Sequence, residues 1–165
     1  MTKLEQMVQT VNIGRIDQAK LENNKIIIDT TLGYDDIINV HFDINADIFE
    51  PYDLKSALTT LTSIKIAAFA YYTFEKEANP NIVRPVSDIN IVAKALNDIV
   101  ITFTMSDINV RLNWFVADKF MTITNWYFER NGNVFEIARD EIPLDPEKYS
   151  PKDRIRYVME QVEKL

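Results

Sequence analysis

The sequence predicts an α+β fold. It comprises a four-stranded antiparallel meander over about residues 98–139, helices packed on one of its faces, and an N-terminal β-hairpin over about residues 25–45. Three observations predict this fold. Short turn signals divide the meander into strand-length segments, residues 37–45 alternate between apolar and polar, and apolar residues recur at helical spacing near both ends of the chain. The length and an apolar content of 47% are typical of one domain, so we expect residues 1–165 to form a single unit.

The first element is a helix expected over residues 3–12. Thr2 followed by Glu5 has the spacing of a capping box, and Gly14 can end the helix. Its apolar residues fall on one face: Leu4, Met7, Val8 and Val11.

Two strands form the predicted hairpin. Residues 25–32 are rich in β-branched residues, and after a short connection residues 37–45 alternate with the period of a half-buried strand. One face of the second strand is apolar (Ile38, Val40, Phe42 and Ile44) and the other is polar (Asn39, His41, Asp43 and Asn45).

Two helices are expected in the middle of the chain. Residues 53–78 predict a long buried helix, which Asp53 begins and Asn79-Pro80 ends. Ser87 is interpreted as the N-cap of a short helix. Its inward residues would be Ile89, Val92, Ala93 and Leu96.

Three turn signals set the register of the meander: Ser106-Asp107, Ala117-Asp118 and Asn131-Gly132. With two-residue loops at these places, the first two strands pair Met105 with Ile108, Phe103 with Val110, Ile101 with Leu112 and Ile99 with Trp114. The next turn pairs Trp114 with Met121 and Leu112 with Ile123. These residues form one continuous apolar face, and that agreement between separate turns supports the assignment.

The opposite face of the meander is predicted to be polar and then aromatic. Its polar residues are Thr102, Thr104, Asn109, Arg111, Asn113, Thr122 and Thr124. The last two strands add an aromatic patch, and the partner-binding residues proposed on this face are Trp126, Phe128, Phe135, Arg111 and Ile137. Two alternatives remain open: a helix or the hairpin covers these aromatic residues as a second core layer, or they stack on the bases of a single-stranded nucleic acid.

The chain closes with a helix that Ser150 caps and Pro151 begins, with Asp153 in its first turn. Its apolar stripe is Ile155, Val158, Met159, Val162 and Leu165.

Scarce residue types exclude several chemistries. The chain has no Cys, one His and three Gly. Thiol nucleophiles and cysteine–zinc clusters therefore have no residues to build on, and the three glycines cannot be arranged into a glycine-rich phosphate loop. A Ser-His-Asp arrangement would have to use His41. The absence of Cys fits a reducing compartment, and there is no secretory signal or membrane-spanning run, so we expect a cytoplasmic protein without membrane contact. A net charge of −7 disfavours binding to nucleic acid.

A metal or catalytic site is the alternative at the hairpin. His41 and Asp43 share one strand face, and Asp29 can lie across from them. An imidazole with two carboxylates can hold a divalent cation or act as acid and base. No metal-binding motif supports this site, and alternating polar residues on the solvent face of a strand are expected in any case.

The sequence therefore predicts a non-enzymatic, acidic accessory protein that acts through protein–protein contacts and needs no cofactor. Its partner is a second copy, in a homodimer, or a different protein. The chain has 21 Ile and 14 Asn, and both have AT-rich codons. With the small size and acidic charge, this suggests a viral or mobile-element protein that inhibits a host enzyme. The alternative function is a metal-dependent enzyme or binder centred on the hairpin around residues 29–43.

Overall fold

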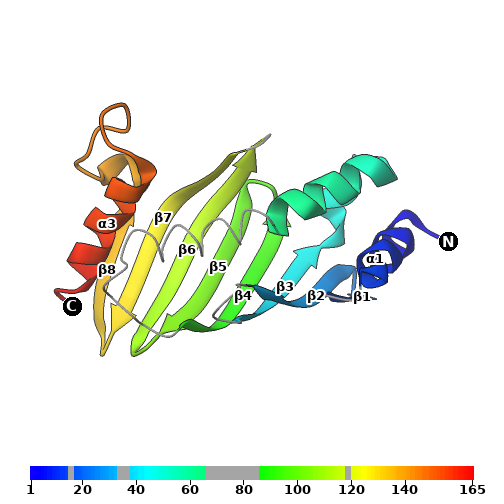
Figure 1. Ribbon diagram of the computed structural model, residues 1–165, viewed down its shortest axis with the longest axis horizontal. Helices are drawn as coiled ribbons and strands as arrows, with labels where there is room; N and C mark the ends of the chain where they lie inside the picture. The colour runs from blue at the N-terminus through cyan, green and yellow to red at the C-terminus, as the bar shows by residue number, and fades with distance from the viewer. Residues whose placement is uncertain (15–16, 33–37, 66–85, 118–119) are drawn as a thin grey trace.

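The strands in the described residues form one eight-stranded sheet, in the order in which they occur along the chain (Figure 1). The computed structural model describes residues 1–14, 17–32, 38–65, 86–117 and 120–165. The strands are β1 (Gln18–Glu22), β2 (Lys25–Leu32), β3 (Ile38–Asn45), β4 (Val86–Ala95), β5 (Asp98–Met105), β6 (Ile108–Ala117), β7 (Phe120–Arg130) and β8 (Asn133–Ala138). The helices are α1 (Lys3–Ile13), the 3-10 turns η1 (Ala46–Phe49) and η2 (Arg139–Glu141), and α3 (Pro151–Val162), and residues 54–65 are also helical.

The α+β class is confirmed, and the predicted meander is present as β5 to β8. The hairpin β2–β3 extends the meander, and the sheet is larger than expected because β1 and β4 also belong to it. The link is β4, which pairs in parallel with β3 and antiparallel with β5. A parallel pair needs a long crossover connection, which is the chain between β3 and β4.

The helix predicted from Ser87 is wrong, since these residues form β4. Ile91 and Ala93 are fully buried two positions apart, which is the period of a strand, and Ile89 packs against the same core. Asp88 has a left-handed φ of 56°, at a shift in the pairing with β5. Strands on both sides satisfy the backbone of β4, and this tertiary context overrides the local capping signal.

Strand β1 was not predicted. It pairs with β2 through the turn Asn23-Asn24, whose φ angles of 50° and 59° are typical of a type I′ hairpin turn. The strand is largely exposed, so its residues lack the apolar alternation that predicts strands.

The register predicted for β5 and β6 is confirmed, from Met105 opposite Ile108 to Ile99 opposite Trp114. The register predicted between β6 and β7 is wrong. Ala117 pairs with Phe120, and a β-bulge inserts Thr124 between the partners of Trp114 and Asn113. Trp114 therefore pairs with Ile123, and Leu112 with Trp126 instead of Ile123.

The bulge reverses the face of the rest of β7. One inserted residue exchanges the two sides of a strand, so Trp126 and Phe128 lie on the core face, opposite Leu112 and Val110. The hydroxyl of Thr124 donates to the Asn113 carbonyl at 3.1 Å, which gives that carbonyl a partner inside the bulge.

The three longer helices pack on one face of the sheet. Their buried residues join those of the strands in a single core cluster: Met7 from α1, Ala57, Leu61 and Ile64 from the helix 54–65, and Ile155, Val158, Met159 and Val162 from α3. In Figure 1, α1 lies at the β1 end of the sheet and α3 at the β8 end.

The predicted helix caps are confirmed at both ends of the chain. Thr2 and Glu5 form a capping box at α1, and Ser150 and Asp153 form one at α3. Gly14 is the C-cap of α1, with an ordinary right-handed φ of −68°. The long helix predicted over 53–78 is seen over 54–65, and its remainder lies outside the described residues.

Candidate functional site

The face of the sheet opposite the helices carries a continuous row of polar side chains from β2 to β8. Each member is the cross-strand partner of the next, so all of them point to the same side of the sheet. The row consists of Asp29, His41, Asn90, Thr102, Arg111, Tyr127 and Glu136. All of these residues are exposed or half-buried, so this face of the sheet is accessible along the row.

The centre of the row is a shallow hollow of about 270 Å³ around Arg111 and Tyr127. The guanidinium of Arg111 lies over the Tyr127 ring, 4.4 Å from its centroid, in a cation–π contact. Asp88, Thr102, Thr104 and Asn109 supply the polar lining. The hollow thus combines a cation and an aromatic ring with hydrogen-bonding groups.

Hydrogen bonds hold the side chains that flank this hollow. The Asn109 amide donates to Glu129 at 2.8 Å, and the Asn125 amide donates to Glu136 at 3.0 Å. Glu129 also accepts the backbone N–H of Gly132 at 2.8 Å. The Gly132 and Asn109 hydrogen bonds lower the pKa of Glu129 below 4.5, so this carboxylate is charged at neutral pH.

Of the residues predicted to bind a metal, the structure brings two together. His41 Nδ1 lies 2.7 Å from Asp29 Oδ1, across the β2–β3 pair as expected. The third, Asp43, instead pairs with Lys25 at 3.1 Å. Among the described residues, no three His, Asp or Glu side chains lie close enough together to hold a metal ion.

The predicted aromatic patch does not lie on the exposed face. Trp126, Phe128 and Ile137 are 6%, 1% and 9% exposed and belong to the core. Phe135 pairs with Phe128 on the same side and is half-buried. The bulge at Thr124 is the physical reason for this correction. Of the five residues proposed to bind a partner, Arg111 is the one whose predicted place on the exposed face is confirmed.

Sequence reasoning missed Tyr127 as a surface residue. The signal was present in the alternation of β7: once Trp126 and Phe128 face the core, Tyr127 between them must face outward.

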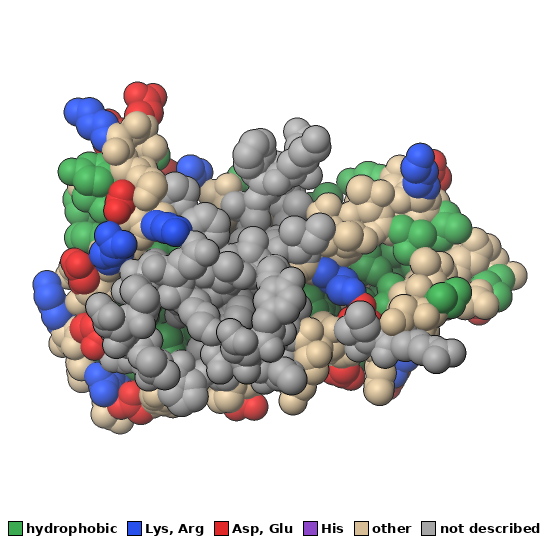
Figure 2. Space-filling model, viewed as in Figure 1, with side chains coloured by type: hydrophobic (Ala, Val, Ile, Leu, Met, Phe, Trp, Pro, Cys, Tyr) green, Lys and Arg blue, Asp and Glu red, His purple; other side chains and the backbone are tan. Residues whose placement is uncertain are grey.

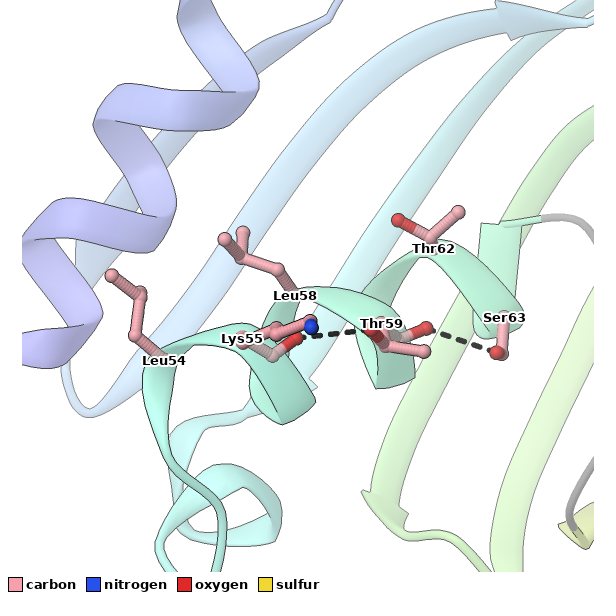
Figure 3. Close-up of a pocket in the computed structure, with 6 residues that line it drawn as sticks. All are labelled: Leu54, Lys55, Leu58, Thr59, Thr62 and Ser63. Carbon is pink, nitrogen blue, oxygen red and sulfur yellow. Dashed lines mark hydrogen bonds between the residues drawn. The ribbon is translucent and has the colours of Figure 1, made fainter.

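A second hollow, of about 560 Å³, lies along the helix 54–65 (Figure 3). Its lining includes Leu54 and Leu58 together with three hydroxyl side chains, of which Thr59 and Ser63 donate to backbone carbonyls one turn earlier. In Figure 2 this helix contributes to apolar surface near α1. Because these two hydroxyls are satisfied within the helix, they form no convergent polar site.

Comparisons with protein-family models, with curated proteins and with solved structures found no match. In the described part of the chain, no helix has both the length and the apolar character that crossing a membrane requires.

Proposed function

We propose that this protein is a non-enzymatic binding module, and that its contact surface is the exposed face of the sheet around Arg111 and Tyr127. The observation that carries the proposal is the one-sided packing of the helices. They cover one face of the sheet, and the other presents a row of polar side chains with a hollow at its centre.

The side chains around the hollow suit a protein partner. Arg and Tyr are the residue types that most often dominate binding energy at interfaces. Here they hold each other in place, as do the pairs Asn109–Glu129 and Asn125–Glu136. Groups that are already ordered lose less conformational entropy when a partner binds, so more of the contact energy contributes to affinity.

The charge on this face favours protein over nucleic acid. Arg111 shares its row with the carboxylates of Asp29 and Glu136, and the whole chain carries −7. Binding to a phosphate backbone needs clustered basic residues, which this row lacks. A partner that offers hydrogen-bond donors and a carboxylate for Arg111 fits the surface better.

The test uses peptides selected from a display library on the 165-residue chain. Binding of the selected peptides is then measured by fluorescence anisotropy to wild type and to Arg111→Glu. We expect peptide affinity to fall by about 30-fold, or ~2 kcal/mol. The substitution removes a hot-spot arginine and places a negative charge that repels the carboxylate of the peptide. Circular dichroism checks that the variant is folded.

Lys55→Glu is the matched control, since it makes the same charge change on an exposed residue of the helix 54–65, on the other side of the sheet. It should leave peptide affinity unchanged. Equal binding of the selected peptides to wild type and Arg111→Glu would place the contact elsewhere. Tighter binding of a single-stranded oligonucleotide than of any peptide would favour the nucleic-acid alternative.

The alternative function, a metal-dependent enzyme or binder at the hairpin, is favoured by one observation, the contact between His41 and Asp29. A ligand that binds only the folded state raises the melting temperature. Thermal unfolding with and without Mg²⁺, Mn²⁺ and Zn²⁺, on wild type and His41→Ala, separates the two functions. A metal-dependent rise in the melting temperature that His41→Ala abolishes would support the metal site, and we expect no such rise.

Cytoplasmic location and the role of viral or mobile-element inhibitor remain predictions from composition and size. The homodimer is a separate proposal, because it uses the backbone of an edge strand and not the hollow around Arg111 and Tyr127.

A further inference from the structure

The two edges of the sheet differ in how their backbone groups are satisfied. An edge strand presents unpaired N–H and C=O groups to which another strand can add, and proteins usually cover or block them. The edges here are β1 and β8.

The β1 edge is blocked by α1. Beside a two-residue turn, antiparallel pairing points the backbone groups of Ala19 and Leu21 away from β2. The side-chain amide of Asn12 donates to the Ala19 carbonyl at 2.9 Å and accepts the Ala19 N–H at 2.7 Å. Asn12 thus occupies the place of a neighbouring strand and leaves only Leu21, next to the turn, facing outward.

The β8 edge is open along two successive outward positions. Arg130 and Asn133 flank the turn, so the backbone groups of Val134, Glu136 and Ala138 point away from β7. Glu141 accepts the N–H of Ala138 at 3.1 Å. The N–H and C=O groups of Val134 and Glu136 have no partner among the described residues, and both residues are exposed, Val134 to 51%.

We propose that β8 pairs antiparallel with β8 of a second copy, which joins the two sheets edge to edge around a two-fold axis at Phe135. In this register Val134 lies opposite Glu136 of the second copy, and each such pair exchanges two backbone hydrogen bonds. The half-buried Phe135 lies against its own counterpart on the core face, where an aromatic pair adds stability.

Charge and hydrogen bonding select this register over its neighbour. A two-fold axis at Glu136 would set two Glu136 carboxylates directly opposite each other, which is unfavourable. It would also need the N–H of Ala138, which already donates to Glu141.

We choose a second copy of the chain as the partner because this contact is complete with two copies. The sheet formed by the described strands has one open edge, and an isologous contact uses the same edge of both copies. With Asn12 on the β1 edge, this sheet offers no further edge to a third copy, so a dimer forms instead of a fibre. This surface is separate from the Arg111 hollow, and either proposal can fail without the other.

The test measures mass by sedimentation velocity over a concentration series. Wild type should approach the mass of two copies as concentration rises. Val134→Glu places a carboxylate opposite Glu136 of the second copy in both symmetric pairs. The dissociation constant of the dimer should therefore rise about tenfold. Val134→Lys, at the same exposed position, places a cation there and should keep the dimer or tighten it.

Two proline variants test the backbone. Glu136→Pro removes an N–H that points away from β7, so the protein should remain folded and become a single copy. Leu21→Pro makes the same change at the blocked edge and should leave the dimer intact. Circular dichroism and urea unfolding verify folding, and if Glu136→Pro is unfolded the pair of Val134 variants decides.

A wild type that stays monomeric over the whole series overturns the proposal. So does a dimer that Val134→Glu and Val134→Lys affect equally, since that result would mean a different interface. If the β8 edge instead pairs with a strand of another protein, the wild type would be a monomer that binds a β-strand peptide, and Glu136→Pro would abolish this binding.

Discussion

At the residue scale, the sharpest constraints are left-handed backbone positions. The turn Asn131-Gly132 has φ angles of 50° and 82°, and this turn orients the whole of β8. Asn23 and Asn24 occupy the same region at the β1–β2 turn, and Ser106 occupies it at the β5–β6 turn. Asn adopts it at modest cost because its short polar side chain bonds locally, which is why the Asn131-Gly132 turn could be predicted from the sequence.

The two glycines that the structure describes should respond in opposite directions to replacement by alanine. At Gly132 an added Cβ meets no atom within 4 Å, so the cost of Gly132→Ala comes only from the positive φ. The free energy of unfolding should fall by about 1–2 kcal/mol. At Gly14 the φ of −68° is ordinary and the Cβ lies 3.6 Å from the Val11 carbonyl oxygen, so Gly14→Ala should stabilise by about 0.5 kcal/mol. Urea unfolding measures both, and a Gly132→Ala as stable as wild type would contradict the turn geometry.

At the element scale, the decisive feature is the bulge in β7. The hairpin registers of β5–β6 and β7–β8 follow from their turns, and both were predictable from Ser106-Asp107 and Asn131-Gly132. The bulge at Thr124 was not, because an inserted residue carries no composition signal of its own and is selected by what the strand packs against. The proposed site therefore moved from Trp126 to its neighbour Tyr127, on the other face.

Alanine substitutions at two adjacent residues of β7 should show that their side chains lie on opposite faces of the sheet. Phe128→Ala removes a ring that is 1% exposed, and a cavity there should lower unfolding free energy by about 3–5 kcal/mol. Tyr127→Ala removes a half-buried ring from the outer face and should cost much less. Urea midpoints of the two variants give the comparison. A larger loss for Tyr127→Ala would mean that the face assignment is reversed.

At the scale of the whole molecule, the parallel pair β3–β4 unites two locally folded parts. The strands β1 to β3 form one antiparallel unit, the meander β5 to β8 forms another, and β4 lies between them. One core cluster runs under the entire sheet, from Met7 of α1 to Val162 of α3. A shared core makes partial unfolding expose apolar surface on both sides, so the molecule should unfold as one unit.

Cooperative unfolding is measurable with two probes from different ends of the sheet. Both tryptophans, Trp114 and Trp126, lie in the meander, so their fluorescence reports on that end. An amide hydrogen-exchange or NMR probe on Met7 or Ile28 reports on the other. Their urea transitions should coincide, and separate midpoints would mean that residues 1–165 contain two independently stable units.

The sequence by itself determined the α+β class, both capped terminal helices, the β2–β3 hairpin and the register of two turn-linked strand pairs, β5–β6 and β7–β8. These depend on interactions between residues close in the chain, such as Ser150 with Asp153 or Met105 with Ile108. Tertiary structure alone decided that Ser87 begins no helix, that Thr124 bulges, and that the two parts form one sheet. Each of these depends on partners distant in the chain, and one such partner, a strand beside β4 or a core beneath Trp126, outweighs the local preference of a few residues.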